Sequence, residues 1–343
     1  MDEPAVAPPG ESPAATPAPF RLIERLFVPI CVAAGALGLA LPGPEFLNAA
    51  IYPVLFAMMF LSCLSLPVGE IGRHLKRPWL LAWLVLFSMV LLPLAGYGVA
   101  RLAFPAAAAA ILILIAMPGG MMNSSLAGLC GGDAALALVG TGVTTLACPL
   151  TVPLLLWFAG IRPEHAGSAA AHFGRQALWL SLFVFIPPCL AALVRRAAPG
   201  TVPRAVPSLR GVSVLLLSFL VYVGLSRCRA PLEAGKGAWL EGAKILAVLF
   251  VLSGVLHAAG YFLAFGRNVR ERIALSVNVA YMNNMLGFVF ALKFFGNRPE
   301  FILPLVLMEF PMHIWLAPLR AFGRRALGRE AAGGGKIGTY YSF

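Results

Sequence analysis

A short polar stretch interrupts a long apolar segment of the chain. It covers residues 118–125, with the sequence PGGMMNSS, and it follows an apolar run over residues 106–117. A proline and two adjacent glycines cannot continue a regular helix, so we expect the backbone to open there and to free several N–H and C=O groups. The residues of the break are Pro118, Gly119 and Gly120. The residues beside it that can supply hydrogen bonds or oxygen ligands are Asn123, Ser124 and Ser125.

A second apolar segment carries a similar polar pair. Residues 279–287 have the sequence VAYMNNMLG, which places Asn283 and Asn284 side by side within an apolar run. In hydrocarbon, freed backbone groups are tolerated only where protein or a water-filled cavity satisfies them. Two interrupted helices at matching positions of two halves are typical of the substrate and ion site of a secondary transporter. The alternative is that these polar side chains only hydrogen-bond neighbouring helices as packing contacts.

The composition indicates a membrane protein. Of the 343 residues, 60% are hydrophobic and only 12% are charged, whereas soluble domains carry about 25% charged residues. Basic residues in cytoplasmic loops account for the formal net charge of +12, so the expected partner is the lipid bilayer and not nucleic acid. The six cysteines show no paired spacing that would indicate disulfides or a metal site.

Ten apolar segments are long enough to span a bilayer, which takes about 20 residues. The fourth and ninth segments contain the two polar stretches, and Asp133 is placed to cap the start of the fifth. The seventh segment is the shortest, and the connection Arg195–Arg210 before it is the longest. The approximate limits are 24–42, 47–68, 78–102, 106–130, 133–159, 171–194, 211–227, 238–265, 270–294 and 301–320.

Five segments per half would place the two halves in opposite membrane orientations. We therefore predict an all-α membrane protein with ten transmembrane helices in two inverted five-helix repeats, whose broken fourth and ninth helices cross near the midplane. Most of the 26 Lys and Arg residues fall on one side if both termini are cytoplasmic, which favours an N-in, C-in protein of the inner (plasma) membrane. The predicted division is a disordered cytoplasmic N-terminal tail (1–20), a first repeat (21–160), a second repeat (161–322) and a basic cytoplasmic C-terminal tail (323–343).

The residues around both breaks resemble the signature of the bile acid:sodium symporter family. The first motif consists of Pro118-Gly119-Gly120, then Gly132-Asp133, and then Leu136, Thr141, Thr144, Thr145 and Pro149; the second is YMNNMLG at residues 281–287. The resemblance extends over roughly residues 24–320 and is specific in these two stretches. It implies a panel domain (helices 1, 2, 6 and 7) and a core domain (helices 3–5 and 8–10). It also implies alternating access, sodium sites behind the crossing helices and an organic anion as substrate.

The chain departs from the family pattern at the sodium ligands. The family's Ser-Asn pair is Asn123-Ser124 here, and its Ser and Thr on the next helix are Ala137 and Thr141. Asn278 stands where the family has a Glu, and the family's Gln positions are Met282 and, in the third helix, Ser88. Loss of the carboxylate removes the charge that offsets burial of a cation. We expect the second sodium site to be lost and a weak first site, with the ligands Asn123, Ser124, Thr141 and Asn278.

Glu309 and His313 are candidates for another coupling group. They lie four residues apart in the tenth segment, on one helical face. An ionisable residue at that depth is costly and is a functional candidate by default, and a carboxyl group beside an imidazole could carry a proton through a transport cycle. The alternative is that Glu309 pairs with a basic residue near a helix end. His257, alone in the eighth segment, is interpreted as a core residue.

The substrate class follows from the residues around the breaks and from the resemblance. Met121, Met122, Met282 and Met285 would make a soft, apolar site that suits an amphipathic solute. We expect a secondary active transporter for an organic anion (a bile-acid-like, amphipathic or carboxylate solute), cation-coupled with sodium coupling weakened or lost. The alternatives are a proton-coupled or uncoupled carrier or efflux protein of the same fold, or a non-transporting membrane sensor.

Other classes fit the sequence less well. No enzyme is expected, because no activated nucleophile, histidine cluster or paired carboxylates are apparent. A channel would require a continuous polar stripe along a pore, and the polar residues cluster at two breaks instead. Na+ as a coupling ion is the one candidate in place of a cofactor. The sequence does not define the oligomeric state.

Overall fold

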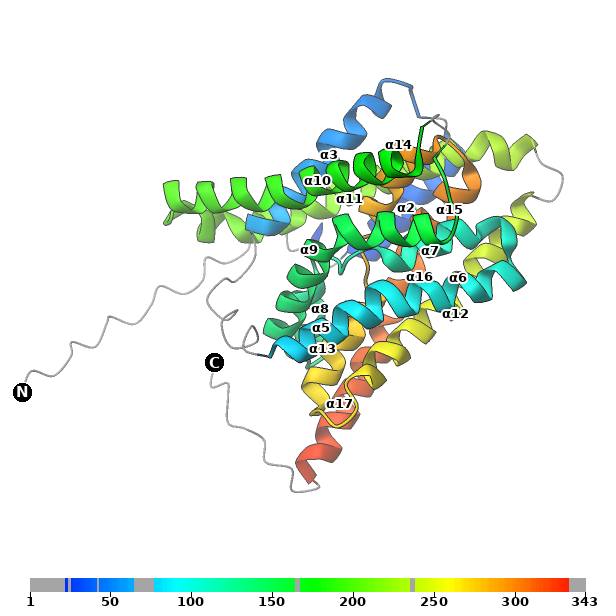
Figure 1. Cartoon of the computed structure of the whole chain (residues 1–343). Helices are drawn as coiled ribbons and strands as arrows, with labels where there is room; N and C mark the ends of the chain where they lie inside the picture. Colours follow the sequence, from blue (N-terminus) through cyan, green and yellow to red (C-terminus); the bar gives the residue numbers. More distant parts are fainter. Residues whose placement is uncertain are drawn as a thin grey trace, which may run out of the picture.

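The computed structural model describes residues 22–23, 26–41, 43–64, 77–163, 167–234 and 238–332 (Figure 1). Within these ranges the chain is helical apart from turns, short connections and one isolated bridge. The all-α class predicted from the apolar segments is therefore confirmed. The predicted tail over residues 1–20 lies outside the described residues, as do the last residues, 333–343, of the tail predicted over 323–343.

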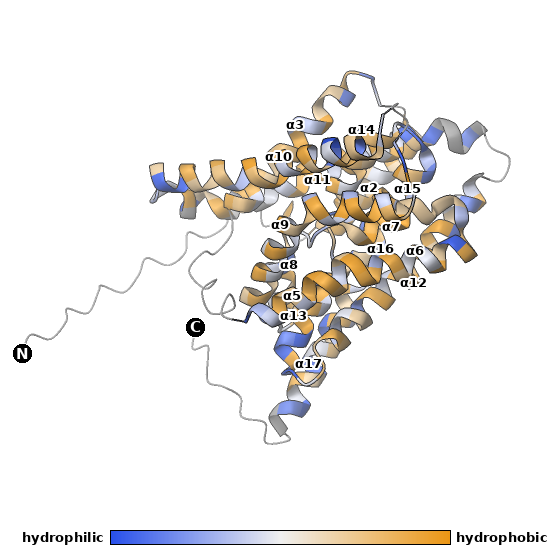
Figure 2. Cartoon of the chain, in the orientation of Figure 1, coloured by the Kyte–Doolittle hydropathy of each residue, from blue (hydrophilic) through white to orange (hydrophobic). Residues whose placement is uncertain are grey.

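Seven helical segments in the described ranges are long and apolar enough to cross a membrane. They are α3 (Leu47–Leu64), the continuous segment Pro78–Ala103, α9 (Ala134–Phe158), α10 (Ala169–Ala197), the part Gly211–Arg229 of α11 (Thr201–Ala234), the part Trp239–Leu263 of α12 (Ala238–Leu263) and the segment Pro299–Glu330. Three further apolar helices are shorter, namely α2 (Phe27–Ala40), Pro105–Ala116 and α14 (Asn284–Phe295). Hydrophobic residues extend along these helices and hydrophilic residues gather at their ends (Figure 2).

The segment Pro78–Ala103 contains a π-helical turn. It consists of α5 (Pro78–Leu86), the π turn η2 (Phe87–Leu91) and α6 (Leu92–Ala103). Ser88 is buried at the start of the turn, and its hydroxyl donates to the carbonyl of Leu84 at 2.7 Å. π turns of this kind occur often at functional sites. This one contacts α9, which carries residues of the crossing described below, and α7, which leads into it.

The seventh apolar segment belongs to a longer helix than its hydropathy predicts. The apolar segment predicted over 211–227 agrees with the membrane-spanning part Gly211–Arg229, but the helix around it, α11, extends from Thr201 to Ala234. The connection from α10 covers only residues 198–200 and is shorter than the predicted Arg195–Arg210. Low hydropathy reports exposure to water and not loss of helix, and Pro203, in the first turn, replaces an N–H group that would have no helical partner. Arg195 in this region donates to the carbonyls of Cys63 and Leu64 at the end of α3.

One group of helices is held together by close backbone contact. Helix α2 packs along α11, and α3 packs against both α10 and α11. Gly38 allows the closest approach, since a Cβ atom at this position would lie 2.4 Å from the carbonyl oxygen of Tyr222 on α11. Small residues at such contacts let membrane helices approach closely and gain dispersion energy.

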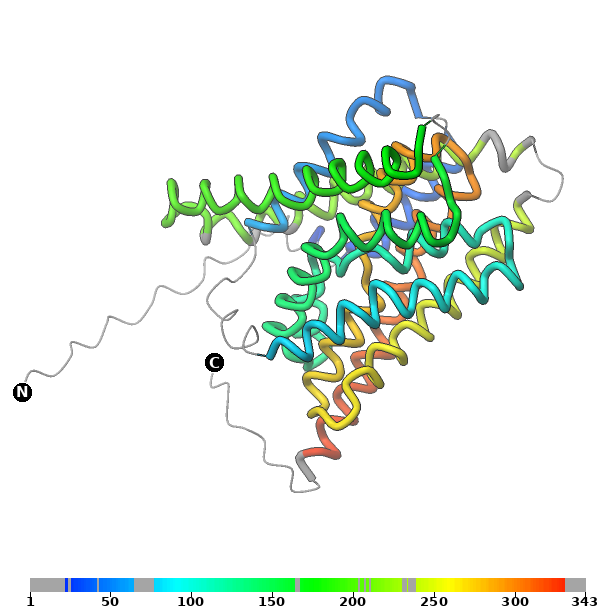
Figure 3. The backbone as a smooth tube through the Cα atoms, viewed as in Figure 1, coloured from blue at the N-terminus to red at the C-terminus, as the bar shows by residue number. Residues whose placement is uncertain are grey.

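Two helical segments are interrupted near their middles. The first consists of α7 (Ala108–Ala116) and α8 (Asn123–Leu129), and the second of α13 (Val269–Ala280) and α14. The backbone tube leaves the helical path in both segments (Figure 3). Helix α9 contacts α7, α8 and α13, so it lies beside both interruptions and connects them. Its N-cap is Asp133, whose carboxylate accepts from the N–H of Leu136 at 2.9 Å, as predicted.

The last apolar segment is divided by two turns. Its parts are α15 (Pro299–Leu307), α16 (Glu309–Ile314) and α17 (Leu316–Ala332). Helix α16 contacts α2, α12, α15 and α17. This position brings one buried turn of helix, with Glu309 at its start, into the middle of the bundle.

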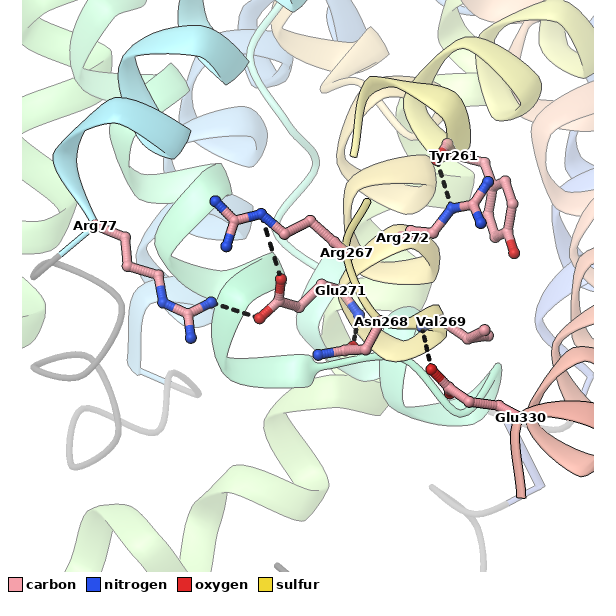
Figure 4. A network of polar contacts seen from close by, with 8 residues as sticks. All are labelled: Arg77, Tyr261, Arg267, Asn268, Val269, Glu271, Arg272 and Glu330. Carbon is pink, nitrogen blue, oxygen red and sulfur yellow. Dashed lines mark hydrogen bonds and ion pairs between the residues drawn. The ribbon is translucent and has the colours of Figure 1, made fainter. Parts of the chain in front are cut away.

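A network of charged residues joins the start of α13 to three other helices (Figure 4). Glu271 is buried and pairs with Arg77 before α5 and, at 3.9 Å, with Arg267 after α12. The N–H of Val269 donates to a carboxylate oxygen of Glu330 on α17. These contacts hold the ends of α5, α12, α13 and α17 together.

Candidate functional site at the helix crossing

The two interruptions meet and satisfy each other's backbone. Gly119 and Met282 form an isolated antiparallel bridge. The N–H of Gly120 donates to the carbonyl of Tyr281 at 2.6 Å, and the N–H of Asn283 donates to the carbonyl of Pro118 at 2.8 Å. Groups that a proline and two glycines remove from the helical ladder are thereby paired inside the bundle, as an apolar surrounding requires.

A polar cluster surrounds Gly119 on the side of α9. The N–H of Gly119 donates to the hydroxyl of Thr144 at 3.1 Å. The hydroxyl of Thr141 donates to Oδ1 of Asn278 at 3.1 Å, and Nδ2 of Asn278 donates to the carbonyl of Ala137 at 3.0 Å. These side chains come from α9 and α13, so the structure brings the predicted residues Thr141 and Asn278 together across 137 positions of sequence.

Asn123 belongs to the same cluster but lacks partners. Its side chain is 1% exposed, and neither polar atom makes a hydrogen bond within the described part of the chain. A Cβ atom added to Gly119 or to Gly120 would lie against the side-chain amide of Asn123, so this amide is close to both glycines. A buried amide without partners costs free energy unless a ligand, an ion or water satisfies it. Ser124 is half-buried and Ser125 is exposed, so the three neighbours do not share one environment.

The cluster offers oxygen ligands but no negative charge. Thr141 and Asn278 contribute a hydroxyl and an amide oxygen, and Thr141 also lies 3.4 Å from the carbonyl of Gly120. Hydroxyl, amide and carbonyl oxygens are the ligand types that hard cations prefer. The Asn278 amide nitrogen, however, donates to a carbonyl at the position where a carboxylate would attract a cation. The residues present therefore supply uncharged oxygen ligands of the type that Na+ takes.

The second interruption carries two asparagines with different tasks. Asn283 caps α14, since its Oδ1 accepts from the N–H of Leu286 at 3.1 Å. Asn284 points to α16, where its Nδ2 donates to Oε2 of Glu309 at 3.2 Å. Oδ1 of Asn284 is buried and makes no hydrogen bond among the described residues.

Glu309 and His313 form a buried pair on α16. Nδ1 of His313 lies 2.7 Å from the backbone carbonyl of Glu309 and 3.8 Å from its Oε1. Because a carbonyl oxygen only accepts, this ring nitrogen carries a hydrogen. No Lys or Arg in the described ranges lies within 4 Å of the Glu309 carboxylate, so the simple pairing with a basic residue at a helix end is not what the structure shows. Phe27 of α2 covers the His313 ring at 4.5 Å.

A cavity of about 80 Å³ opens beside the crossing. Glu309, His313, Asn283, Asn284 and Asn123 all line it. Six of its lining residues are methionines, namely Met58, Met121, Met122, Met282, Met285 and Met312. The space is enough for a few water molecules, and polar groups of both interruptions line it.

A further part of the cavity lining was not predicted from the sequence. It comes from α3 and α11 and consists of Met58, Ser62, Ser213, Val214 and Leu217. These residues belong to ordinary apolar segments without a polar pattern, so nothing in the sequence marks them. The one available signal is the family resemblance, which implies a panel domain that contains helices 2 and 7 and a core domain that contains the crossing helices.

Apolar helices in which two interrupted segments meet beside a cavity define the architecture of a secondary transporter. The model of the Sodium Bile acid symporter family matches residues 52–230, more than half of the chain, and the chain belongs to this family. The resemblance read from the two motifs is thus confirmed. Membership of a transporter family agrees with the expectation that the protein is a membrane transporter and not an enzyme.

Curated relatives are similar over most of the chain. A probable sodium/metabolite cotransporter of rice chloroplasts, BASS1 (Oryza sativa subsp. japonica), is 27% identical over 261 residues, or 73% of this chain and 59% of its own length. An uncharacterized sodium-dependent transporter of Bacillus subtilis (strain 168), YocS, is 26% identical over 70% of this chain and 72% of its own length. A second probable rice cotransporter, BASS2, is 24% identical over 81% of this chain and 65% of its own. The chain therefore spans less than two thirds of either rice relative.

Proposed function

We propose that this protein is a secondary active transporter that moves an organic anion across the membrane by alternating access. The observation that carries the proposal is the mutual pairing of two interrupted helices beside a cavity lined by their polar side chains. An interrupted helix in lipid is costly unless its freed groups serve a buried site. The names of the similar proteins, sodium/metabolite cotransporter and sodium-dependent transporter, agree with this class.

The proposal includes ten membrane crossings in two inverted repeats, with both termini cytoplasmic. The seven long segments together with α2, the α7–α8 segment and the α13–α14 segment add up to the ten crossings. The interrupted segments are then the fourth and the ninth, and each repeat has five. The antiparallel bridge between Gly119 and Met282 supports opposite orientations of the two repeats. The domain limits 21–160 and 161–322 follow from this division, and the membrane proposed is the plasma membrane.

The cavity supports an amphipathic solute and a moving wall. Its methionines offer a polarizable, adaptable surface, and no Lys or Arg is among its lining residues. A volume of about 80 Å³ is far below the roughly 300–1,000 Å³ of small-molecule sites. The wall formed by α3 and α11 must therefore separate from the crossing for a bile-acid-like or other carboxylate solute to enter.

Sodium coupling is proposed to be weakened or lost at the crossing. The amide of Asn278 replaces the family's carboxylate, and its hydrogen bonds to Thr141 and Ala137 hold the cluster together without a cation. The remaining oxygen ligands are uncharged, so little free energy offsets the removal of water from Na+. Asn123 keeps its proposed role as a ligand, because its amide oxygen has no other partner among the described residues.

Measuring thermal stability as a function of sodium concentration tests whether sodium coupling is weakened or lost. The full chain in detergent is heated over a range of NaCl concentrations, with KCl at equal ionic strength as the control. We expect no sodium-specific rise in Tm for the parent, and a saturable rise for Asn278→Glu but not for the uncharged Asn278→Gln. A saturable sodium effect in the parent that Asn123→Ala and Thr141→Val both abolish would contradict the loss of coupling.

Glu309 is proposed as the group that couples transport to protons. It is buried, it is joined to the second interruption through Asn284, and its carboxylate faces His313 within the same turn of helix. Tyr281 and Cys31 are the other titratable groups near it. A proton taken up by the carboxylate from one side and released to the other would move with the solute when the cavity changes access.

Uptake into proteoliposomes tests the coupling and the transport itself. The probes are radiolabelled taurocholate, which is amphipathic, and succinate, which is not, under an imposed pH or sodium gradient. We expect saturable taurocholate uptake that the pH gradient stimulates, and we expect Glu309→Gln to lose this stimulation while Glu300→Gln, at a half-buried position paired with Arg298, keeps it. Uptake that ignores both gradients would indicate an uncoupled carrier. Absence of any uptake with intact binding would indicate a membrane sensor.

A further inference from the structure

A second cavity lies at the far end of α11 from the crossing. It has a volume of about 150 Å³ and shares no lining residue with the cavity beside the crossing. Leu217 lines the first cavity and Arg227 the second, so about 15 Å of helix separates them. The walls come from the α2–α3 connection, the start of α3, the end of α11 and the α14–α15 connection; the residues are Gly43, Pro44, Leu47, Asn48, Val223, Ser226, Arg227 and Asn297.

Arg227 brings a positive charge into this cavity without an acidic partner. Its Nη1 donates to Oδ1 of Asn297 at 3.3 Å, and its Nε is buried and makes no hydrogen bond among the described residues. No Asp or Glu of the described chain lies within 4 Å of it, although Arg229 pairs with Glu233 at 2.8 Å on the same helix. A partly buried cation normally has a counter-ion.

The other polar groups of the cavity also have hydrogens to donate. The Ser226 hydroxyl oxygen accepts from the N–H of Gly43 at 2.5 Å, so its own hydrogen remains for another acceptor. Asn297 accepts from Arg227 through Oδ1, which leaves its amide N–H groups for the cavity. The first turn of the 18-residue helix α3, with Leu47 and Asn48, also faces this space and contributes the positive end of its dipole.

We infer that this cavity is a binding site for a small monovalent anion, with Arg227 as the counter-charge and Ser226 and Asn297 as hydrogen-bond donors. Both a carboxylate group of an organic solute and an inorganic anion such as chloride have this chemistry. A bound anion would tie the α2–α3 connection and α11 to the α14–α15 connection. The inference does not depend on what the cavity beside the crossing transports.

An anion titration of the purified full chain tests the site. Tm is measured in sodium HEPES, whose anion is too large for the cavity, with increasing acetate or chloride at constant sodium and ionic strength. We expect a saturable rise in Tm of roughly 2–4 °C for the parent. Arg227→Gln should lose it, and Arg229→Gln, two residues along the same helix, should keep it.

Acetate and chloride distinguish an organic carboxylate from an inorganic anion as the ligand of this cavity. A rise with acetate alone identifies a carboxylate site, and a rise with chloride alone or with both identifies a site that takes inorganic anions. Either result supports the inference. No saturable effect of either anion on the parent, or an equal effect on Arg227→Gln, would overturn it.

Two further variants protect the test against misfolding. Ser226→Ala removes one donor and keeps the charge, so we expect the anion concentration at half-effect to rise several-fold. Glu309→Gln lies in the other cavity and should leave the anion effect unchanged. If Arg227→Gln does not fold, an unaltered half-effect concentration in Ser226→Ala would still contradict the proposed site. Failure of the transport proposal would leave these anion results as they are.

Discussion

A side chain at position 119 would collide with three polar groups of the crossing. A Cβ atom at this position would lie 2.9 Å from Nδ2 of Asn123 and 3.0 Å from both Oδ1 of Asn278 and Oγ1 of Thr141. We expect Gly119→Ala to push the two interrupted segments apart, to lower the free energy of unfolding by about 1–3 kcal/mol and to reduce uptake more than tenfold. Gly98→Ala on α6, where nothing lies within 4 Å, is the control and should leave both unchanged or slightly raise stability. If Gly119→Ala keeps the parent's unfolding free energy and uptake, the crossing is loosely packed.

The hydroxyl of Thr141 is expected to contribute to stability. Thr141→Val keeps the shape but leaves Oδ1 of Asn278 without its donor, which should cost about 1–3 kcal/mol of unfolding free energy. Chemical denaturation in detergent measures this. Thr151→Val on the same helix removes only a bond to the carbonyl of Ala147 four residues earlier, so it should change stability much less. Equal effects of the two variants would contradict the importance of the Thr141–Asn278 bond.

For individual residues, the sequence predicts which side chains are polar and buried, but not which of these side chains are in contact with one another. The clustering of Asn123, Thr141 and Asn278 could be expected only from the family resemblance, because Thr141 and Asn278 are far apart in the chain. The bond from Asn284 to Glu309 could not be predicted in either way. It depends on how α16 is set between two turns. Pro311 and Pro318 lie four residues after the ends of α15 and α16 and account for the turns, but they do not determine which side chain the Glu309 carboxylate meets.

Among the elements, the start of α13 is held by a buried carboxylate. Glu271 is buried and serves Arg77 and Arg267 from two neighbouring segments. We expect Glu271→Gln to lower the free energy of unfolding by about 1–3 kcal/mol, because two cations lose a desolvated partner. Glu241→Gln breaks an exposed pair with Lys244 and should cost at most about 1 kcal/mol. Thermal unfolding at low and high salt compares them, and equal losses would show that the Glu271 network does not fasten these helices.

The two interruptions could be predicted from the sequence, but the start of α11 could not. A proline beside two glycines determines locally that α7 must end, and no tertiary contact can restore the missing N–H. The extension of α11 back to Thr201 depends instead on helical structure that leaves the apolar region. Hydropathy detects only the part of a helix that lies in lipid. The predicted helix was therefore shorter than α11, and the predicted connection before it was longer than the observed one.

For the whole molecule, alternating access predicts that α11 changes its exposure to water. Ser213 lines the cavity beside the crossing, and Cys189 is the one exposed native cysteine among the six. In a Cys189→Ser background, we expect the reactivity of Ser213→Cys with a membrane-impermeant thiol reagent to change several-fold when taurocholate is added. Leu215→Cys, on the exposed side of the same helix, is the matched control and should not respond. Constant reactivity at position 213 would contradict movement of this wall.

The pairing of the two interruptions also has a consequence for biosynthesis. The carbonyl of Pro118 receives its hydrogen from the N–H of Asn283, which the ribosome adds much later. At roughly 5–20 residues per second, about 8–30 s pass between the two. During this time the first half of the protein holds an open backbone in the membrane without its permanent partner. Insertion must therefore proceed with the nascent chain sheltered by the insertion machinery or by water, and a ribosome stalled between the two halves should leave a product that quality-control proteases remove.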